Sequence, residues 1–365
     1  MKKHAILVSM IVATMFATSC SKDDGDNVEQ PVAQEVQNED NNKSEAQNAE
    51  SRQIVIKADN GKILSDVEAT DGYNFTFSKG NKLVLTDGET TYATLEIDGE
   101  AGSSSATFKG EISTKADNKS IYAVIEGQSP LSEVKTSTVS LADVVQSNCY
   151  FKSEKFDYNA NSELSVTLND QNAYLVFEVS ENQKKVNIGS EWYDAANGKL
   201  FAAVPAGEVS GRFFGKKTAK SSEIYTIIRT DVVDLGVGNV LWCTSNVTET
   251  QMDYSSANTA YGTADANGYR LPTKEEYDAL LAVTPSGGWT TENGTNGWKF
   301  TNDKGSVFFP AAGFDGGNYA GNEGVYWSSS PDGGNAYFLI FNNIDAGVNL
   351  SFVDYECSVR LVRGL

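Results

Sequence analysis

The sequence predicts a mainly β protein, in which a β-sandwich region is followed by a smaller α+β domain. Residues 53–232 contain a succession of short apolar–polar alternations separated by turn residues such as Asp87-Gly88 and Asn197-Gly198, a pattern typical of antiparallel strands. The clearest amphipathic helix lies later, within residues 268–281, among further strand patterns and glycine-rich loops. A chain of 365 residues is long enough for two or three domains with cores of their own.

Residues 1–19 have the pattern of a lipoprotein signal peptide. Two lysines precede an apolar run, residues 5–16, which is too short to span a bilayer. Small residues then lead to Cys20, as in a bacterial lipobox, where the cysteine becomes the lipidated first residue. The acidic pair Asp23-Asp24 resembles the export signal of Bacteroidetes-type surface lipoproteins. We therefore expect an outer-membrane protein exposed at the cell surface, which contacts the membrane through its lipid anchor only.

Residues 20–52 predict a disordered tether between the anchor and the fold. This segment is rich in Asp, Glu, Asn, Gln and Ser and has few apolar residues, so it cannot bury enough surface to fold. Arg52 lies where the tether meets the first strand pattern. Such a junction is accessible to a trypsin-like protease.

Composition excludes several classes of function. The single histidine, His4, lies in the segment expected to be removed, so Ser-His-Asp catalysis, Cys-His catalysis and histidine-ligated zinc are excluded in the mature chain. Loss of the two N-terminal lysines changes the formal charge from −20 to −22, and such a surface repels nucleic acid. We expect a protein that is not an enzyme, needs no cofactor or metal, and does not bind nucleic acid.

The strand candidates of residues 53–232 predict β-sandwich architecture. This length is large for one small sandwich, so two sandwiches in series, divided near residues 129–150, are an alternative to one. The candidates are residues 53–58, 74–78, 82–86, 91–98, 106–113, 120–126, 164–168, 173–180, 184–188, 199–204, 209–214 and 223–229.

The order of these strands resembles the fimbrillin-like proteins of Bacteroidales, which are lipoprotein precursors built from two transthyretin-like sandwiches. The resemblance rests on residues 75–83, 106–112, 120–125, 173–179 and 199–205. It implies fimbrial subunits as partners, and a protease that cuts after an arginine to free a groove for a neighbour's strand. Arg52 matches that site only as an arginine at the start of the fold. An unrelated surface β-sandwich is the alternative interpretation.

The helix within residues 268–281 has a clear start signal. Thr273 and Glu276 have the spacing of a capping box, in which each side chain satisfies a backbone N–H of the first turn. Tyr277, Leu280 and Leu281 fall on one face of the helix. That face is expected to be buried.

Residues 233–365 resemble the Fibrobacter succinogenes major paralogous domain, a family similar in fold to C-type lectins and to the formylglycine-generating enzyme domain. Six segments occur in the family's order, although the stretch between residues 247 and 268 lacks an aromatic-rich segment common in relatives. The enzyme's close pair of cysteines is also missing, so oxidase activity is not expected. The segments are residues 241–247, 268–277, 305–314, 324–330, 336–341 and 358–363.

Three cysteines remain after the lipobox. In an oxidising compartment, one disulfide and one thiol is the simplest arrangement. Cys243 and Cys357 lie in the first and last strand patterns of the C-terminal domain, so they could form the bond if these strands pair. The alternative is two buried, reduced cysteines that act as small hydrophobes, as expected for Cys149.

Three loops of the C-terminal domain are candidates for ligand contact, namely residues 286–298, 315–326 and 331–335. Aromatic faces beside amide and carboxylate groups suit sugar recognition. The alternative is that the tryptophans belong to the core and the polar residues make turns. A Ca²⁺ site has no EF-hand or lectin-type spacing to support it. The candidate contacts are Trp289, Trp298, Asp315, Asn318, Tyr319, Asn322, Glu323 and Tyr326.

Arg270 and Arg360 are flanked by apolar residues, so each is expected to pair with a carboxylate in a structural role.

The order of anchor, tether, sandwiches and C-terminal domain predicts a surface lipoprotein that acts as an adhesin or as an accessory or tip subunit of fimbriae. Its lectin-like head would bind a glycan or a host or bacterial surface protein. The alternative is a free-standing glycan-capture lipoprotein of the outer membrane.

Overall fold

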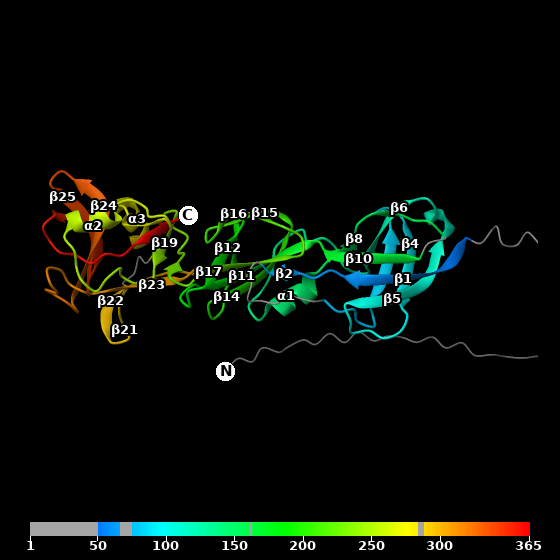
Figure 1. Cartoon of the computed structure of the whole chain (residues 1–365). Helices are drawn as coiled ribbons and strands as arrows, with labels where there is room; N and C mark the ends of the chain where they lie inside the picture. The colour runs from blue at the N-terminus through cyan, green and yellow to red at the C-terminus, as the bar shows by residue number, and fades with distance from the viewer. Residues whose placement is uncertain (1–49, 66–74, 161–162, 284–287) are drawn as a thin grey trace, which may run out of the picture. The chain divides into compact units, whose positions relative to one another are not determined.

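The computed structural model describes residues 50–65, 75–160, 163–283 and 288–365, and these are mainly β (Figure 1). The signal peptide, Cys20 and nearly all of the expected tether lie outside the described residues. None of the helices that the structure describes has the length and apolar character of a membrane span.

The first sheet has the strand order β3-β4-β5-β1-β10-β8-β6-β9, and β3 also pairs with β6. The pairing of β3 with β6 therefore closes the sheet on itself, and the strands enclose one core. This core includes Leu83, Phe108, Phe151 and Leu168. A single 3-10 turn, Thr114–Ala116, follows β5. The strands are β1 (Ser51–Asn60), β3 (Lys82–Thr86), β4 (Thr91–Ile97), β5 (Ser105–Ser113), β6 (Ser120–Ile125), β8 (Phe151–Ser153), β9 (Phe156–Asp157) and β10 (Leu164–Asp170).

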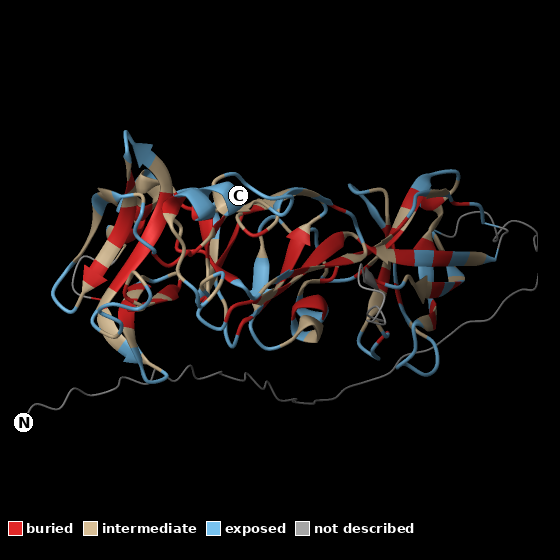
Figure 2. Cartoon of the chain, turned by 60° about the vertical axis from the view of Figure 1, so that its left-hand side comes forward, coloured by how far each residue is buried: buried red, intermediate tan, exposed pale blue. Residues whose placement is uncertain are grey.

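The second sheet has the order β2-β17-β11-β14-β7, and both of its faces are covered. Helix α1 (Leu141–Asn148) lies along one face of this sheet (Figure 1) and is partly buried (Figure 2). Val144 and Val145 of this helix pack against Tyr174, whereas Leu175 and Phe177 face the other core. The strands are β2 (Leu64–Ser65), β7 (Lys135–Ser137), β11 (Asn172–Val179), β14 (Lys199–Pro205) and β17 (Glu223–Arg229), with the hairpins β12 (Lys185–Ile188)–β13 (Glu191–Asp194) and β15 (Gly207–Gly211)–β16 (Gly215–Ala219).

The chain passes repeatedly between these two sheets, so the expected division near residues 129–150 does not separate them. That segment contains β7 and α1, which belong to the second sheet, and residues 151–170 then return to the first sheet as β8, β9 and β10. The helix was not expected, because its apolar face is short; Ser140 starts it by accepting the Asp143 N–H.

In the C-terminal region, from β18 onward, the described residues form three small sheets and two helices. Strand β19, which ends at Cys243, pairs with β27, so a strand near the start of this region lies beside its last strand. The elements are β18 (Val232–Val233), β19 (Val240–Cys243), α2 (Tyr254–Tyr261), β20 (Tyr269–Arg270), α3 (Lys274–Leu281), β21 (Trp289–Glu292), β22 (Thr295–Thr301), β23 (Ser306–Pro310), β24 (Glu323–Asp332), β25 (Asn335–Asn342), β26 (Ala346–Phe352) and β27 (Val362–Gly364).

Helix α3 forms as the sequence predicts. Thr273 and Glu276 make the complete capping box, and Glu276 also pairs with Arg270 at 2.6 Å. Tyr277 is fully buried, and its hydroxyl donates to the Trp327 carbonyl at 3.2 Å. Helix α2 was not predicted from the sequence, because its eight residues are mostly small and polar.

Candidate functional site

The loop between β23 and β24 carries Tyr319, the most exposed aromatic side chain among the predicted ligand contacts. Phe314 and Asn318 exchange backbone hydrogen bonds of 3.0 and 2.8 Å. Gly313 has φ +72°, and a Cβ on it would lie 2.1 Å from the Asn318 carbonyl oxygen, so only glycine fits. Asp315 and Tyr319 also have positive φ, at 45° and 62°. A backbone that is strained at non-glycine residues is a feature often found at functional sites.

The loop is tied to two other segments. The Asp315 N–H donates to the Glu356 carbonyl at 2.8 Å, and the Glu356 N–H donates to Asp315 Oδ1 at 2.7 Å. Gln251 Oε1 accepts the N–H groups of Gly316 and Gly317, while its Nε2 donates to the Ala312 carbonyl. Asp315 therefore braces the loop. The sequence reasoning missed Gln251, because its partners lie more than sixty residues away.

An aromatic pocket of about 390 Å³ lies beside this loop. Tyr319 is 64% exposed, and its ring stacks on Phe314 at 5.7 Å and 14°. Tyr355 meets Phe314 edge-on at 5.7 Å. The lining residues are Phe314, Tyr319, Glu323, Val325, Phe338, Ile340, Ser351, Tyr355 and Cys357. The rings form an apolar wall with one accessible aromatic face, which is the geometry that stacks on the apolar face of a sugar ring.

Glu323 supplies the charged group of this aromatic pocket. Partial burial raises the pKa of its carboxyl above the ordinary value. In the part of the chain that the structure describes, no side chain or backbone N–H donates a hydrogen bond to this carboxylate. It is therefore free to accept hydrogen bonds from a ligand that enters the pocket.

A second hollow adjoins the aromatic pocket and shares Tyr355 with it. Phe352 lies in this hollow and is 68% exposed, and Asp354 and Glu356 add carboxylates. We call the four rings of Phe314, Tyr319, Phe352 and Tyr355 the aromatic surface.

Several predicted contact residues lie elsewhere. Tyr326 is fully buried and its hydroxyl donates to the Pro310 carbonyl at 2.7 Å. Trp298 is 5% exposed and packs on Phe300 and Phe341, while Trp289 is partly buried against the same core. The prediction of ligand contact is therefore wrong for Tyr326 and Trp298, because their rings fill the space between the sheets.

The remaining predicted loop residues are at the surface. Asn318 and Asn322 are exposed, next to Tyr319, but they do not line the aromatic pocket. Residues 331–335 include the turn that joins β24 to β25. Residues 286 and 287 lie outside the described residues.

The expected disulfide is not formed. Cys149, Cys243 and Cys357 are all free. The strand pairing aligns Trp242 with Val362, and the Cys243 N–H donates to the Leu361 carbonyl. Cys357 therefore lies several residues before the segment that pairs with Cys243. Its backbone forms an isolated β-bridge with Met252 instead.

Arg52 is part of β1 and not of an unpaired junction. It lies opposite Ile112 of β5 in the strand register, and its guanidinium pairs with the Asp117 carboxylate and lies over the Tyr158 ring. Among the described residues the first strand begins at Ser51, before the expected end of the tether. A protease could cut at Arg52 only after this end of β1 separates from β5.

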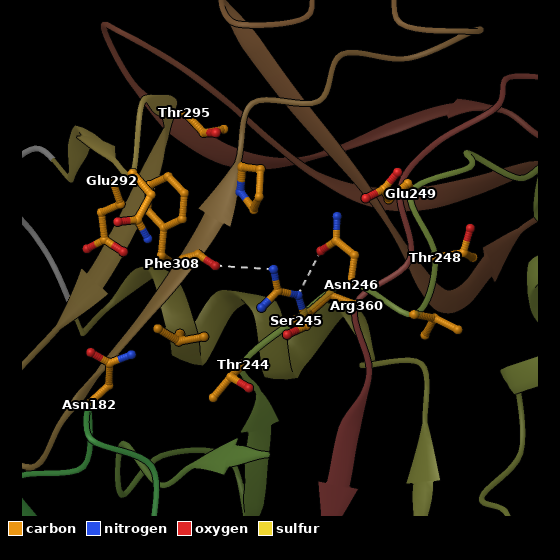
Figure 3. Close-up of a pocket in the computed structure, with 14 residues that line it drawn as sticks. Asn182, Thr244, Ser245, Asn246, Thr248, Glu249, Glu292, Thr295, Phe308 and Arg360 are labelled. Carbon is orange, nitrogen blue, oxygen red and sulfur yellow. Dashed lines mark hydrogen bonds between the residues drawn. The ribbon is translucent and has the colours of Figure 1, made fainter. Parts of the chain in front are cut away.

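A separate, more polar pocket of about 570 Å³ lies between the β19–α2 segment and the β21–β23 sheet (Figure 3). Arg360 borders it and is 1% exposed. The expectation of a carboxylate partner is confirmed for Arg270, which pairs with Glu276, but it is wrong for Arg360, whose acceptors are uncharged. Nowhere in the described ranges does a cluster of three or more His, Cys, Asp or Glu residues form a metal site.

Comparisons with known proteins found similar solved structures but no protein family that matches this sequence. No family model matches the sequence, and no curated protein matches it. A fimbrial protein from Bacteroides ovatus is similar at 10% identity over 86% of this chain and 99% of that one, with a TM-score of 0.26. Candidate cell adhesion proteins from Parabacteroides distasonis and Bacteroides eggerthii are similar at 11% and 16% identity. They cover 55% and 48% of this chain and 77% and 62% of their own, with TM-scores of 0.25 and 0.23. TM-scores this low do not establish a shared fold.

Proposed function

We propose that the protein is a non-catalytic, lipid-anchored adhesin of the cell surface whose C-terminal head recognises a glycan through the aromatic surface. The observation that carries this proposal is Tyr319, which a strained and fully braced loop holds exposed above the aromatic pocket. Glu323, at the same pocket, supplies an acceptor for sugar hydroxyls. The resemblances to fimbrillin-like proteins and to a lectin-like domain, noted in the sequence, agree with this assignment.

Binding to a glycan array by the chain expressed without residues 1–20 tests the recognition step. Tyr319→Ala removes the exposed ring and is expected to weaken binding by about ten-fold or more. Tyr337→Ala is the matched control, because Tyr337 borders neither the aromatic pocket nor its neighbour. Recognition through the aromatic surface is excluded if no glycan binds, or if both variants bind as tightly as the native chain.

The second candidate function is a free-standing glycan-capture lipoprotein, which the same aromatic surface would serve. Mass spectrometry of sheared fimbriae and washed outer membrane separates the two. Enrichment with the fimbriae and an N-terminus at Gln53 would show an assembled subunit processed at Arg52. Recovery only with the membrane, beginning at lipidated Cys20, would support the capture protein.

A further inference from the structure

Arg360 is a buried cation without a counterion. Its side chain is almost completely inaccessible to water, and within the described ranges it forms no ion pair with an acidic group. Buried charges in proteins are normally paired, because desolvation of an isolated charge is costly. Even three partly exposed arginines are each paired with a carboxylate, namely Arg52 with Asp117, Arg212 with Asp234, and Arg270 with Glu276.

Uncharged oxygens hold the Arg360 guanidinium in place. Its Nε donates to Asn246 Oδ1 at 2.8 Å and its Nη2 to the Phe308 carbonyl at 3.2 Å (Figure 3). Its Nη1 donates to the Cys243 carbonyl at 2.8 Å. A guanidinium has five N–H donors, so at least one remains for another oxygen. These partners orient the cation but leave its charge uncompensated.

The pocket beside Arg360 offers neutral hydrogen-bonding groups around this charge. Thr244, Ser245, Thr248 and Thr295 line it with hydroxyls, and Asn182 adds an amide. Figure 3 shows these side chains arranged on several sides of the guanidinium. Groups of this kind bind the hydroxyls of a polar ligand.

Two carboxylates also border the pocket, and they do not cancel the buried charge. Glu292 already pairs with Lys299 at 2.6 Å. Glu249 is exposed, so water and salt screen its charge. Glu249 therefore opposes an anion only weakly, whereas Arg360 acts at short range in a desolvated setting.

We propose that this pocket binds a small acidic sugar, of the hexuronic acid class, with its carboxylate against Arg360 and its hydroxyls among the surrounding threonine, serine and asparagine side chains. A planar guanidinium matches a carboxylate, and a cavity of about 570 Å³ can hold a sugar ring. The chain's charge of −20 disfavours larger polyanions. This site is separate from the aromatic surface, and it stands whether or not that surface binds a glycan.

Calorimetric titration of the chain expressed without residues 1–20 tests the proposal with three probes. Glucuronate is expected to bind at least about ten-fold more tightly than the methyl ester of glucuronic acid, which has the same ring without the charge. No binding of glucuronate, or equal binding of acid and ester, would overturn the site. Binding of N-acetylaspartate amide without binding of glucuronate would overturn the choice of a sugar in favour of an acidic peptide side chain.

Two exposed positions test the role of charge without disturbing the buried arginine. Glu249→Gln removes a negative charge that repels glucuronate and is expected to tighten glucuronate binding by about two- to five-fold. Ser245→Glu adds a negative charge and is expected to weaken binding by at least about five-fold. Glu275→Gln, at an exposed position of α3 outside this pocket and the aromatic surface, is the matched control and leaves the affinity unchanged. Unchanged affinity in the first two variants, with both still folded by circular dichroism, would show that glucuronate binds elsewhere.

Discussion

The loop that carries Tyr319 depends on individual residues in unusual backbone conformations. Asp315 and Tyr319 hold positive φ angles that cost free energy for any residue with a Cβ. Hydrogen bonds offset that cost: the Glu356 N–H donates to Asp315 Oδ1, and the Gly316 N–H donates to Gln251 Oε1. The proposed recognition at the aromatic surface would therefore also depend on Gln251, which lines neither the aromatic pocket nor the adjoining hollow.

Gly313→Ala tests this dependence. The new Cβ would meet the Asn318 carbonyl oxygen and the Ala320 N–H in a backbone with φ +72°, so we expect a loss of about 2–3 kcal/mol in the free energy of unfolding. Urea unfolding measures the change. Gly333→Ala is the control, since Gly333 has a similar φ of +62° with open space around it, and about 1 kcal/mol is expected there from the backbone alone. Equal losses at the two positions would contradict the role of the close contact.

Among the secondary-structure elements, the step from β10 to β11 joins the two N-terminal sheets around a buried carboxylate. Asp170 is fully buried at the end of β10. Its Oδ1 accepts the N–H groups of Tyr150 and Asn172 at 3.0 and 3.1 Å, and the Tyr174 hydroxyl donates to its Oδ2. Burial nevertheless raises the pKa of this carboxyl above its ordinary value.

This raised pKa predicts how Asp170 affects stability as the pH changes. Between its unfolded and folded pKa values the native state holds a proton that the unfolded state has lost, so this group's contribution to stability is greatest below the unfolded pKa and falls as the pH rises through the folded pKa. Asp170→Asn removes the titration. Unfolding in urea from pH 4 upward should show a more negative slope of stability against pH for the native chain than for the variant. Parallel slopes would show that the pKa is not raised.

The molecule as a whole is not a series of simple units along the chain. Residues of β1 lead into β2 of the second sheet, and the strands after α1 return to complete the first sheet. Strand β1 lies between β5 and β10, so the first sheet needs a strand that comes more than a hundred residues later.

Fragments of the chain test this interlocked arrangement. Residues 50–150 lack β8, β9 and β10, including the buried Phe151, Val166 and Leu168, and are expected to be unfolded. Residues 50–234 retain both sheets and are expected to unfold in one cooperative transition. Circular dichroism and scanning calorimetry distinguish these outcomes. A cooperative transition in the shorter fragment would support two independent sandwiches divided near residues 129–150.

Local signals in the sequence were reliable where one short segment contains the whole interaction. The capping box of Thr273 and Glu276 and the buried face of α3 could be predicted because all the groups lie within two helical turns. The candidate loop could also be identified from its aromatic, amide and carboxylate residues. What could not be predicted was which rings point outward, since Tyr319 and Tyr326 are equally suitable by residue type.

Alternation and capping are properties of adjacent residues, so the mainly β composition, most strand positions and the start of α3 could be predicted without the structure. Tertiary structure decided the order of strands in the sheets, the separation of Cys243 from Cys357, and the burial of Arg360 without a carboxylate. Each of these depends on contacts between segments far apart in the chain, where many pairings satisfy the same alternation and packing selects one of them.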